Sequence, residues 1–227
     1  MKKTNFNLLL CCGMFITALV ISNAVANKLI DVPIRLCDQN IWLPGSAICF
    51  IFTFLILNVI TEIWGKDRAN QCVKIGVVCQ IFAALLIILT QYLPPVDTQI
   101  QESYDYMLGR NWIFVVAGLL AYVCSKSLNV AVFGIIKNQL LSSEKFSEKH
   151  RGLWNFVSTA ISQAVDTTVF IVVAFGLGCG WLFDTSLQFT LILMIIGQYM
   201  LKVIAAIITT PIFYICTRKV SRFEETT

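Results

Sequence analysis

The sequence predicts an all-α membrane protein, a bundle of six transmembrane helices that forms a single domain over residues 1–227. Of these 227 residues, 57% are hydrophobic and only 13% are charged, and the mean hydropathy is +0.77. Soluble proteins carry about 25% charged residues, so this chain has too little polar surface to coat a water-exposed fold. Six apolar stretches are each long enough to cross a bilayer, which takes about 20 residues of helix.

The six stretches define the expected helices in chain order. They run from Leu8 to Ala26, Leu43 to Trp64, Cys72 to Leu93, Asn111 to Ile136, Leu153 to Gly180 and Leu187 to Thr217. The first has a rival interpretation, because two lysines followed by an apolar run and Ala24-Val25-Ala26 also resemble a cleaved signal peptide. Its full spanning length and its polar residues favour a retained helix. The last two stretches are long enough to tilt or kink.

Basic residues are concentrated in alternate loops, and positive loops stay on the cytoplasmic side of a membrane. The N-terminal end, the second and fourth loops and the tail hold Lys2, Lys3, Lys66, Arg68, Lys137, Lys145, Lys149, Arg151, Arg218, Lys219 and Arg222. The other loops hold only Lys28, Arg35 and Arg110. We therefore expect both termini in the cytoplasm. The net charge of +4 comes without a long basic run, which argues against direct nucleic-acid binding.

Three ionisable residues lie near the middle of apolar stretches, namely Asp166, Lys126 and Lys202. A charge at the centre of a membrane helix costs about 2.5 to 3.5 kcal/mol on insertion scales, so such residues usually face a polar interior. We expect one polar site near the midplane that accommodates all three. The alternative is a purely structural ion pair between Asp166 and Lys202.

Polar and aromatic residues at helical spacing surround these charges and complete a set of candidate substrate-binding residues. Taken one at a time, Ser, Thr, Asn and Gln are also typical of hydrogen bonds between membrane helices. The full set is Asp166, Gln163, Asn155, Ser162, Lys126, Asn129, Lys202, Asn58, Glu62, Asn23 and Phe170. A weak sequence similarity between the two halves of the chain suggests two inverted three-helix repeats, an architecture found in transporters.

Several signatures of other protein classes are missing from the sequence. There is no G-x-x-x-x-G-K-[ST] loop for nucleotide hydrolysis, and the nine cysteines form no C-x-x-C pair. The single histidine, His150, lies in a charged loop. These features argue against an enzyme, and we expect no metal and no cofactor.

Four blocks of sequence resemble one family in order along the chain. They are Arg151-Gly-Leu-Trp-Asn-Phe-Val-Ser-Thr-Ala-Ile-Ser-Gln-Ala-Val-Asp-Thr-Thr-Val-Phe170, Ser22-Asn23 with Asn27-Lys28, Thr61-Glu62-Ile-Trp-Gly65, and Gly197-Gln-Tyr-Met-Leu-Lys202 with Thr210-Pro211. Together they are similar to the queuosine precursor transporters, also called the vitamin uptake transporter family. The resemblance implies six helices in the bacterial cytoplasmic membrane and import of a 7-deazaguanine base (preQ0, preQ1 or queuine) for tRNA modification.

The chain departs from the family pattern at three positions. Asn58 and Asn129 stand where the family usually has Asp, and Lys126 stands where it usually has Gln. Our hypothesis is that the substrate pocket has shifted toward another member of the series, such as queuine. The alternative is that Lys126 neutralises Asp166 and changes ion coupling.

Two other functions stay open at this point. A six-helix chain without a nucleotide site also suits the substrate-binding subunit of an ATP-driven vitamin or nucleobase importer, which would need a separate energising module. A structural membrane protein without substrate is the third option, although it leaves the buried charges without a reason. The expected partners are a small nucleobase and the lipid bilayer, and the sequence does not decide between a monomer and a homo-oligomer.

Overall fold

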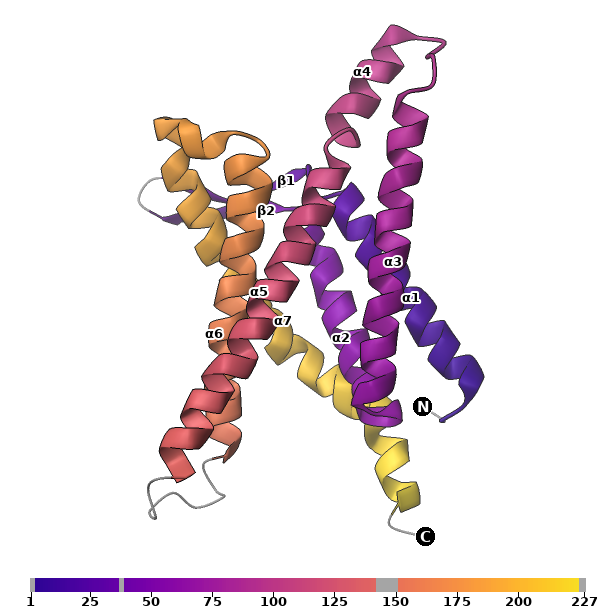
Figure 1. The fold of residues 1–227 in the computed structure, drawn as a ribbon, viewed down its shortest axis with the longest axis vertical. Coiled ribbons are helices and arrows are strands. Elements are labelled where there is room, and N and C mark those ends of the chain that lie inside the picture. Colours follow the sequence, from indigo (N-terminus) through magenta and orange to yellow (C-terminus); the bar gives the residue numbers. More distant parts are fainter. Residues whose placement is uncertain (1–2, 37–38, 142–150, 225–227) are drawn as a thin grey trace. The chain divides into compact units, whose positions relative to one another are not determined.

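The computed structural model describes residues 3–36, 39–141 and 151–224 (Figure 1). Among them, six helices are long and apolar enough to cross a membrane, which confirms the all-α transmembrane prediction. By their contacts, the residues divide into two compact units. Unit 1 comprises Met1–Val115 with Met200–Thr227, and unit 2 comprises Val116–Tyr199.

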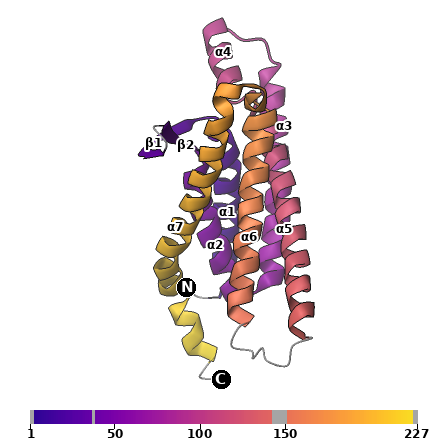
Figure 2. The same ribbon diagram turned by 90° about the vertical axis from the view of Figure 1, so that its left-hand side faces the viewer.

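Three helices of unit 1, α1 (Asn5–Ala24), α2 (Ser46–Trp64) and α3 (Lys66–Gln91), all pack on one another (Figures 1 and 2). Their shared core contains Cys11, Phe15, Ile60, Ala69 and Cys72. Apolar side chains also cover the outer faces of these helices, as expected for surfaces in contact with lipid. The mature protein's retention of α1 stays a prediction.

The turn between α2 and α3 consists of Gly65 alone. Its φ of +89° lies in the region that only glycine adopts readily, so the chain reverses here within one residue. The Gly65 amide still donates to the carbonyl of Thr61 at 3.0 Å, and its own carbonyl accepts from the amide of Ala69 at 3.2 Å. The end of α2 and the start of α3 are therefore held side by side.

An antiparallel hairpin follows α1 and was not predicted. It pairs β1 (Leu29–Leu36) with β2 (Gln39–Pro44), and a bulge lies between Val32 and Arg35, where a proline interrupts the ladder. Ile41 and Leu43 pack with Ala47 of α2 and with Leu201. The hairpin is thus a packed part of unit 1.

The predicted start of the second helix at Leu43 is wrong, because Leu43 and Pro44 belong to β2 and α2 begins at Ser46. Gly45 explains the boundary. Its amide donates to the carbonyl of Lys28 at 2.7 Å, and a Cβ at this position would lie 2.5 Å from the Val25 carbonyl oxygen. The backbone is tied to the end of α1 here, so the apolar run cannot begin its helix earlier. The third helix, α3, begins at Lys66 and not at the predicted Cys72. The prediction followed the apolar stretch, and the first turns of α3 are polar.

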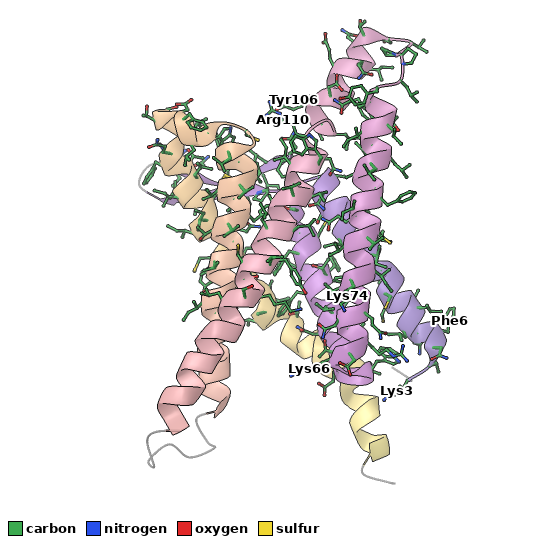
Figure 3. The ribbon with its side chains drawn as sticks, in the orientation of Figure 1. Lys3, Phe6, Lys66, Lys74, Tyr106 and Arg110 are labelled. Atoms are coloured by element: carbon green, nitrogen blue, oxygen red, sulfur yellow. The ribbon has the colours of Figure 1, made fainter. Side chains whose placement is uncertain are left out.

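A second unpredicted element is α4 (Thr98–Met107), a short polar helix that caps the far end of unit 1. Its N-cap is Asp97, whose carboxylate accepts from the amide of Gln99 at 2.9 Å. Tyr104 donates its hydroxyl to the carbonyl of Ile87 at 3.0 Å, which ties α4 to α3. Asn27, after α1, donates to the carbonyl of Tyr106. Figure 3 shows Tyr106 and Arg110 at the end of unit 1 opposite to Lys3 and Lys66.

Unit 2 contains most of α5 (Asn111–Leu141), α6 (Arg151–Ile171) and the first part of α7 (Thr185–Glu224). The last turns of the predicted fifth helix are a π-helical segment, Val172–Leu177, where the amide of Gly178 donates to the carbonyl of Val173 at 2.9 Å. Phe175 in this segment packs on Trp181, with ring centroids 5.5 Å apart. Short π-helical turns often occur close to functional sites.

Candidate functional site

The polar face of α6 is the centre of the candidate site. Ser162 and Thr167 are buried, while Gln163 and Asp166 are half-buried between them. The Thr167 hydroxyl donates to the backbone carbonyl of Gln163 at 2.9 Å, so it needs no partner on another helix. Positions three and four residues apart share a helix face, which places the Ser162 and Gln163 side chains beside Asp166.

A contact between helices joins Asp166 to α5. The hydroxyl oxygen of Ser125 lies 3.4 Å from Oδ1 of Asp166 and 3.2 Å from the backbone carbonyl of Tyr122. A serine hydroxyl carries one hydrogen, so it can donate to only one of these oxygens at a time. A carboxylate can accept several hydrogen bonds, and a contact of 3.4 Å is a weak one. The contact therefore places Ser125 beside the Asp166 carboxylate, which has lone pairs for hydrogen bonds besides this one.

Two buried acceptor oxygens in unit 2 lack a hydrogen-bond donor among the described residues. They are Oε1 of Gln163 on α6 and Oε1 of Gln198 on α7. Leaving a buried polar atom unsatisfied costs about 1 to 3 kcal/mol, so native proteins rarely keep one without a reason. Both atoms could accept from the N–H groups of a bound ligand.

Lys126 extends along its own helix in the structure. Its Nζ lies 2.8 Å from the hydroxyl oxygen of Tyr122, one turn earlier on α5, and the side chain is exposed. The tyrosine hydroxyl accepts the hydrogen bond, and the ammonium lies 5.1 Å from the centre of the Tyr122 ring. Phe170, the aromatic candidate on α6, is half-buried.

The candidates of unit 1 have different environments. Lys202 is buried, with its Nζ 4.7 Å from the centre of the Phe50 ring, a distance typical of a cation–π contact. Asn23 is buried, and its Nδ2 has no acceptor within the described part of the chain. On α2, Asn58 is half-buried and Glu62 is exposed.

Two further candidates lie outside the described side chains. Asn129 is a residue of α5 and Asn155 a residue of α6, but only their backbone helices are described. The shared layer of Asp166, Lys126 and Lys202 stays a prediction.

Sequence reasoning missed several polar residues that the structure singles out. Ser125 is not among the candidate residues, yet it makes the contact to Asp166. Ser46 and Asn111, at the starts of α2 and α5, each bury an oxygen that has no donor in the described ranges. Gln198 lies four residues before Lys202 in the same polar stripe of the sixth helix, but it was left out of the candidate set. Nothing in the sequence marks Ser46 and Asn111 as buried, since residues at helix starts are usually exposed.

Comparison with known proteins gives a family match. The family model described as "Putative vitamin uptake transporter" matches residues 44–216, which is more than half of the chain and includes the polar face of α6. Searches of the curated proteins and of the solved structures found no match. With its six membrane-spanning helices, this chain therefore belongs to the vitamin uptake transporter family and is a multi-pass membrane protein.

Proposed function

We propose that this protein imports queuosine precursors, the 7-deazaguanine bases preQ0, preQ1 or queuine, across the bacterial cytoplasmic membrane for tRNA modification. Membership of the vitamin uptake transporter family supports an uptake function. The finer assignment is supported by the sequence blocks described above, above all Arg151–Phe170, which forms most of α6.

The observation that carries the proposal is the concentration of hydrogen-bond acceptors on α6. A guanine-like base presents a ring N–H and an exocyclic amine side by side, and these two donors match the two oxygens of one carboxylate. Asp166 supplies that carboxylate, and Oε1 of Gln163, which has no donor within the described part of the chain, lies within one turn of it. Ser162 is buried on the same face.

Selectivity follows from the same groups. A base without the matching donors would lose its hydrogen bonds to the carboxylate and would leave the buried glutamine oxygen unsatisfied, which costs about 1 to 3 kcal/mol. Phe170, one turn beyond Asp166, offers an apolar ring on which a flat heterocycle can stack. We further propose that transport proceeds by alternating access around this site. The contribution of Lys202, Asn58, Glu62 and Asn23 to binding stays a prediction.

The decisive experiment uses a bacterium that can neither synthesise nor take up queuosine precursors. Expression of this chain together with external preQ0, preQ1 or queuine should restore queuosine in the tRNA, measured by mass spectrometry of nucleosides. Asp166→Ala should abolish restoration while the protein still reaches the membrane. Restoration by Asp166→Ala at normal expression would refute the role of this carboxylate, and failure of the wild-type chain with every base would refute the substrate class.

A competition assay tests the pocket-shift hypothesis. Lys126→Gln and Asn129→Asp bring the chain closer to the family pattern, so we expect their substrate preference to move from queuine toward preQ0 or preQ1. Uptake of each labelled base is measured against the other two as competitors. An unchanged preference in both variants would contradict the pocket-shift hypothesis. It would not bear on the proposed import function.

Purified protein in liposomes tests whether the chain acts alone. A self-sufficient carrier moves labelled base into vesicles that contain no other protein and no ATP. Transport only after addition of an ATPase module would mean that the chain is a substrate-binding subunit.

A further inference from the structure

A pocket of about 670 Å³ opens at one end of the three-helix core of unit 1. Its lining comes from Lys3, from Asn5, Leu8 and Leu9 of α1, from Trp64 at the end of α2, and from Arg68 in the first turn of α3. The volume is within the range of about 300 to 1,000 Å³ that is typical of small-molecule sites. The substrate site proposed above uses none of these residues.

The position of the pocket relates it to the membrane surface. The spanning helix α1 begins two residues after Lys3, α2 ends at Trp64, and α3 begins two residues before Arg68. All of these helix ends meet at the pocket, and Figure 3 shows Lys3 and Lys66 at the same end of the unit. Tryptophan is enriched at the level of lipid headgroups, which agrees with the place of Trp64. By the distribution of basic residues, this end is expected to face the cytoplasm.

The lining combines cationic and apolar side chains. Lys3 and Arg68 contribute positive charge, and no carboxylate belongs to the described lining. Asp67 and Glu62 lie exposed on the neighbouring helix ends without lining the pocket. Arg68 donates one N–H to Oε1 of Gln71 at 3.2 Å, which restrains the guanidinium on α3 and leaves its other donors for an anion.

The apolar side chains of the lining differ in burial. Leu8 and Trp64 pack against the buried core of α1, α2 and α3, so they are part of the packed unit. Leu9 lines the pocket and is 70% exposed, and Phe6 one turn earlier is 73% exposed. A ligand that matches both the cationic and the apolar side chains carries an anionic head and a hydrocarbon tail.

We propose that this pocket binds a phosphate group, and that the phosphate is the headgroup of an anionic phospholipid whose acyl chains lie along Leu9 and Phe6. Basic pockets between membrane helices on the cytoplasmic side are suited to anionic headgroups. Arg68 contributes the planar fork of donors that matches phosphate oxygens, and Lys3 contributes a mobile point charge. The bound lipid bridges the ends of three helices, and it stabilises their packing without taking part in substrate binding.

The test measures lipid binding to the purified full-length protein by native mass spectrometry. Phosphatidylglycerol is titrated as the anionic lipid and phosphatidylcholine as the zwitterionic reference. Each neutralised charge should weaken phosphatidylglycerol binding roughly 5-fold, so the double variant Lys3→Gln with Arg68→Gln should lose roughly 25-fold. Binding of phosphatidylcholine should not change.

Lys74→Gln is the matched control, because Lys74 is an exposed cation of α3 that does not line the pocket. Loss of affinity in the double variant with retention in the control supports the site. Equal affinity in the double variant, or an equal loss in Lys74→Gln, overturns it in favour of diffuse attraction. If the double variant fails to fold, the two single variants should each show the roughly 5-fold loss.

Inorganic phosphate distinguishes the two sources of the anion. With the wild-type protein, added phosphate at the lipid's concentration should leave phosphatidylglycerol bound, because it lacks the hydrocarbon part. Displacement of the lipid by inorganic phosphate would overturn the lipid assignment in favour of a soluble phosphate ligand. Uptake assays are not used, so this outcome is independent of the proposed transport function.

Discussion

The helices α3 and α6 both cross the membrane, but they bury different kinds of side chain. The buried positions of α3 recur three to four residues apart and are mostly small, namely Ala69, Cys72, Gly76, Gln80 and Ala84. On α6, the inward face carries Ser162, Gln163, Asp166 and Thr167. One helix is built to approach its neighbours closely, and the other presents hydrogen-bonding groups.

The difference shows how a membrane protein separates packing from recognition. Lipid gives helices no hydrophobic reason to associate, so small residues that allow close contact supply the packing energy. Polar side chains add little to association, about 0.6 kcal/mol on average, and an unsatisfied one is costly. Polar groups concentrated on α6 fit the proposed ligand site, and three substitutions test this separation, whereas a fourth concerns the start of α7.

The largest effect is expected at Asp166. Asp166→Asn keeps the shape of the side chain and removes its charge, so charge-assisted hydrogen bonds to the base are lost. At about 1.5 to 3 kcal/mol for a bond to a charged group, uptake should fall roughly 10- to 100-fold. The fall is measured as uptake of labelled base into cells that express wild type and variant at the same level. Asp184→Asn is the control, because Asp184 is a carboxylate of the same unit that lies outside the spanning helices, and its uptake should equal that of wild type.

Gly76→Val should damage packing and leave recognition intact. A Cβ at Gly76 would lie 3.0 Å from Cδ2 of Leu19 and 3.2 Å from Cε1 of Phe15, so the valine side chain would force these side chains, or α1 itself, to shift. Such overpacking lowers the free energy of unfolding by about 1 to 3 kcal/mol. Thermal unfolding in detergent measures the loss. Gly13→Val is the matched control, since a Cβ at Gly13 meets nothing within 4 Å. Equal stability of the two variants would contradict the packing role of α3.

Gln163→Leu should weaken substrate recognition and leave stability intact, which is the opposite of the effect expected for Gly76→Val. The substitution removes a buried oxygen that has no donor among the described residues, so the protein should unfold no more easily than wild type. It also removes one hydrogen bond to the base, and KM for uptake should rise about tenfold, which corresponds to about 1.4 kcal/mol. A variant that loses stability while KM stays constant would mean that Gln163 is a structural residue.

The smallest effect concerns the start of α7. Hydrogen bonds from the side chain and backbone of Ser186 lower the pKa of Asp184 below its ordinary value of 3.8. A lowered carboxyl pKa means that this stabilisation is complete above pH 3.8 and is lost as the pH falls through the lowered pKa. The Tm difference between wild type and Asp184→Ala should therefore be small, constant near neutral pH, and absent in strong acid. A difference that grows in acid would contradict this account.

The sequence predicted the spanning helices well because lipid imposes a simple rule. Every backbone polar group must be paired within the segment, so a long apolar run must be a helix. The predicted helix ends were less accurate, as Leu43 and Lys66 show, because local contacts decide where a helix begins. The hairpin and α4 escaped prediction, since their stability comes from contacts with distant residues such as Leu201 and Ile87.

For the candidate site, the sequence identified residue types and the structure selected among them. Helical spacing alone placed Ser162, Gln163 and Asp166 on one face, and the structure describes that face as buried or half-buried. Spacing could not show that Ser125 contacts Asp166, because that pairing depends on how α5 packs on α6. It also could not show that Lys126 lies against Tyr122, since a long side chain has many rotamers.

Taken by itself, the sequence determined that this chain lies in a membrane, how many times it is able to cross, and which helix carries polar groups. These properties follow from the hydropathy and periodicity of single segments. Only the tertiary structure decided which polar atoms are satisfied, where glycine permits close contact, and that Lys3, Trp64 and Arg68 surround one pocket. Such properties depend on distances between residues far apart in the chain, and no local pattern encodes them.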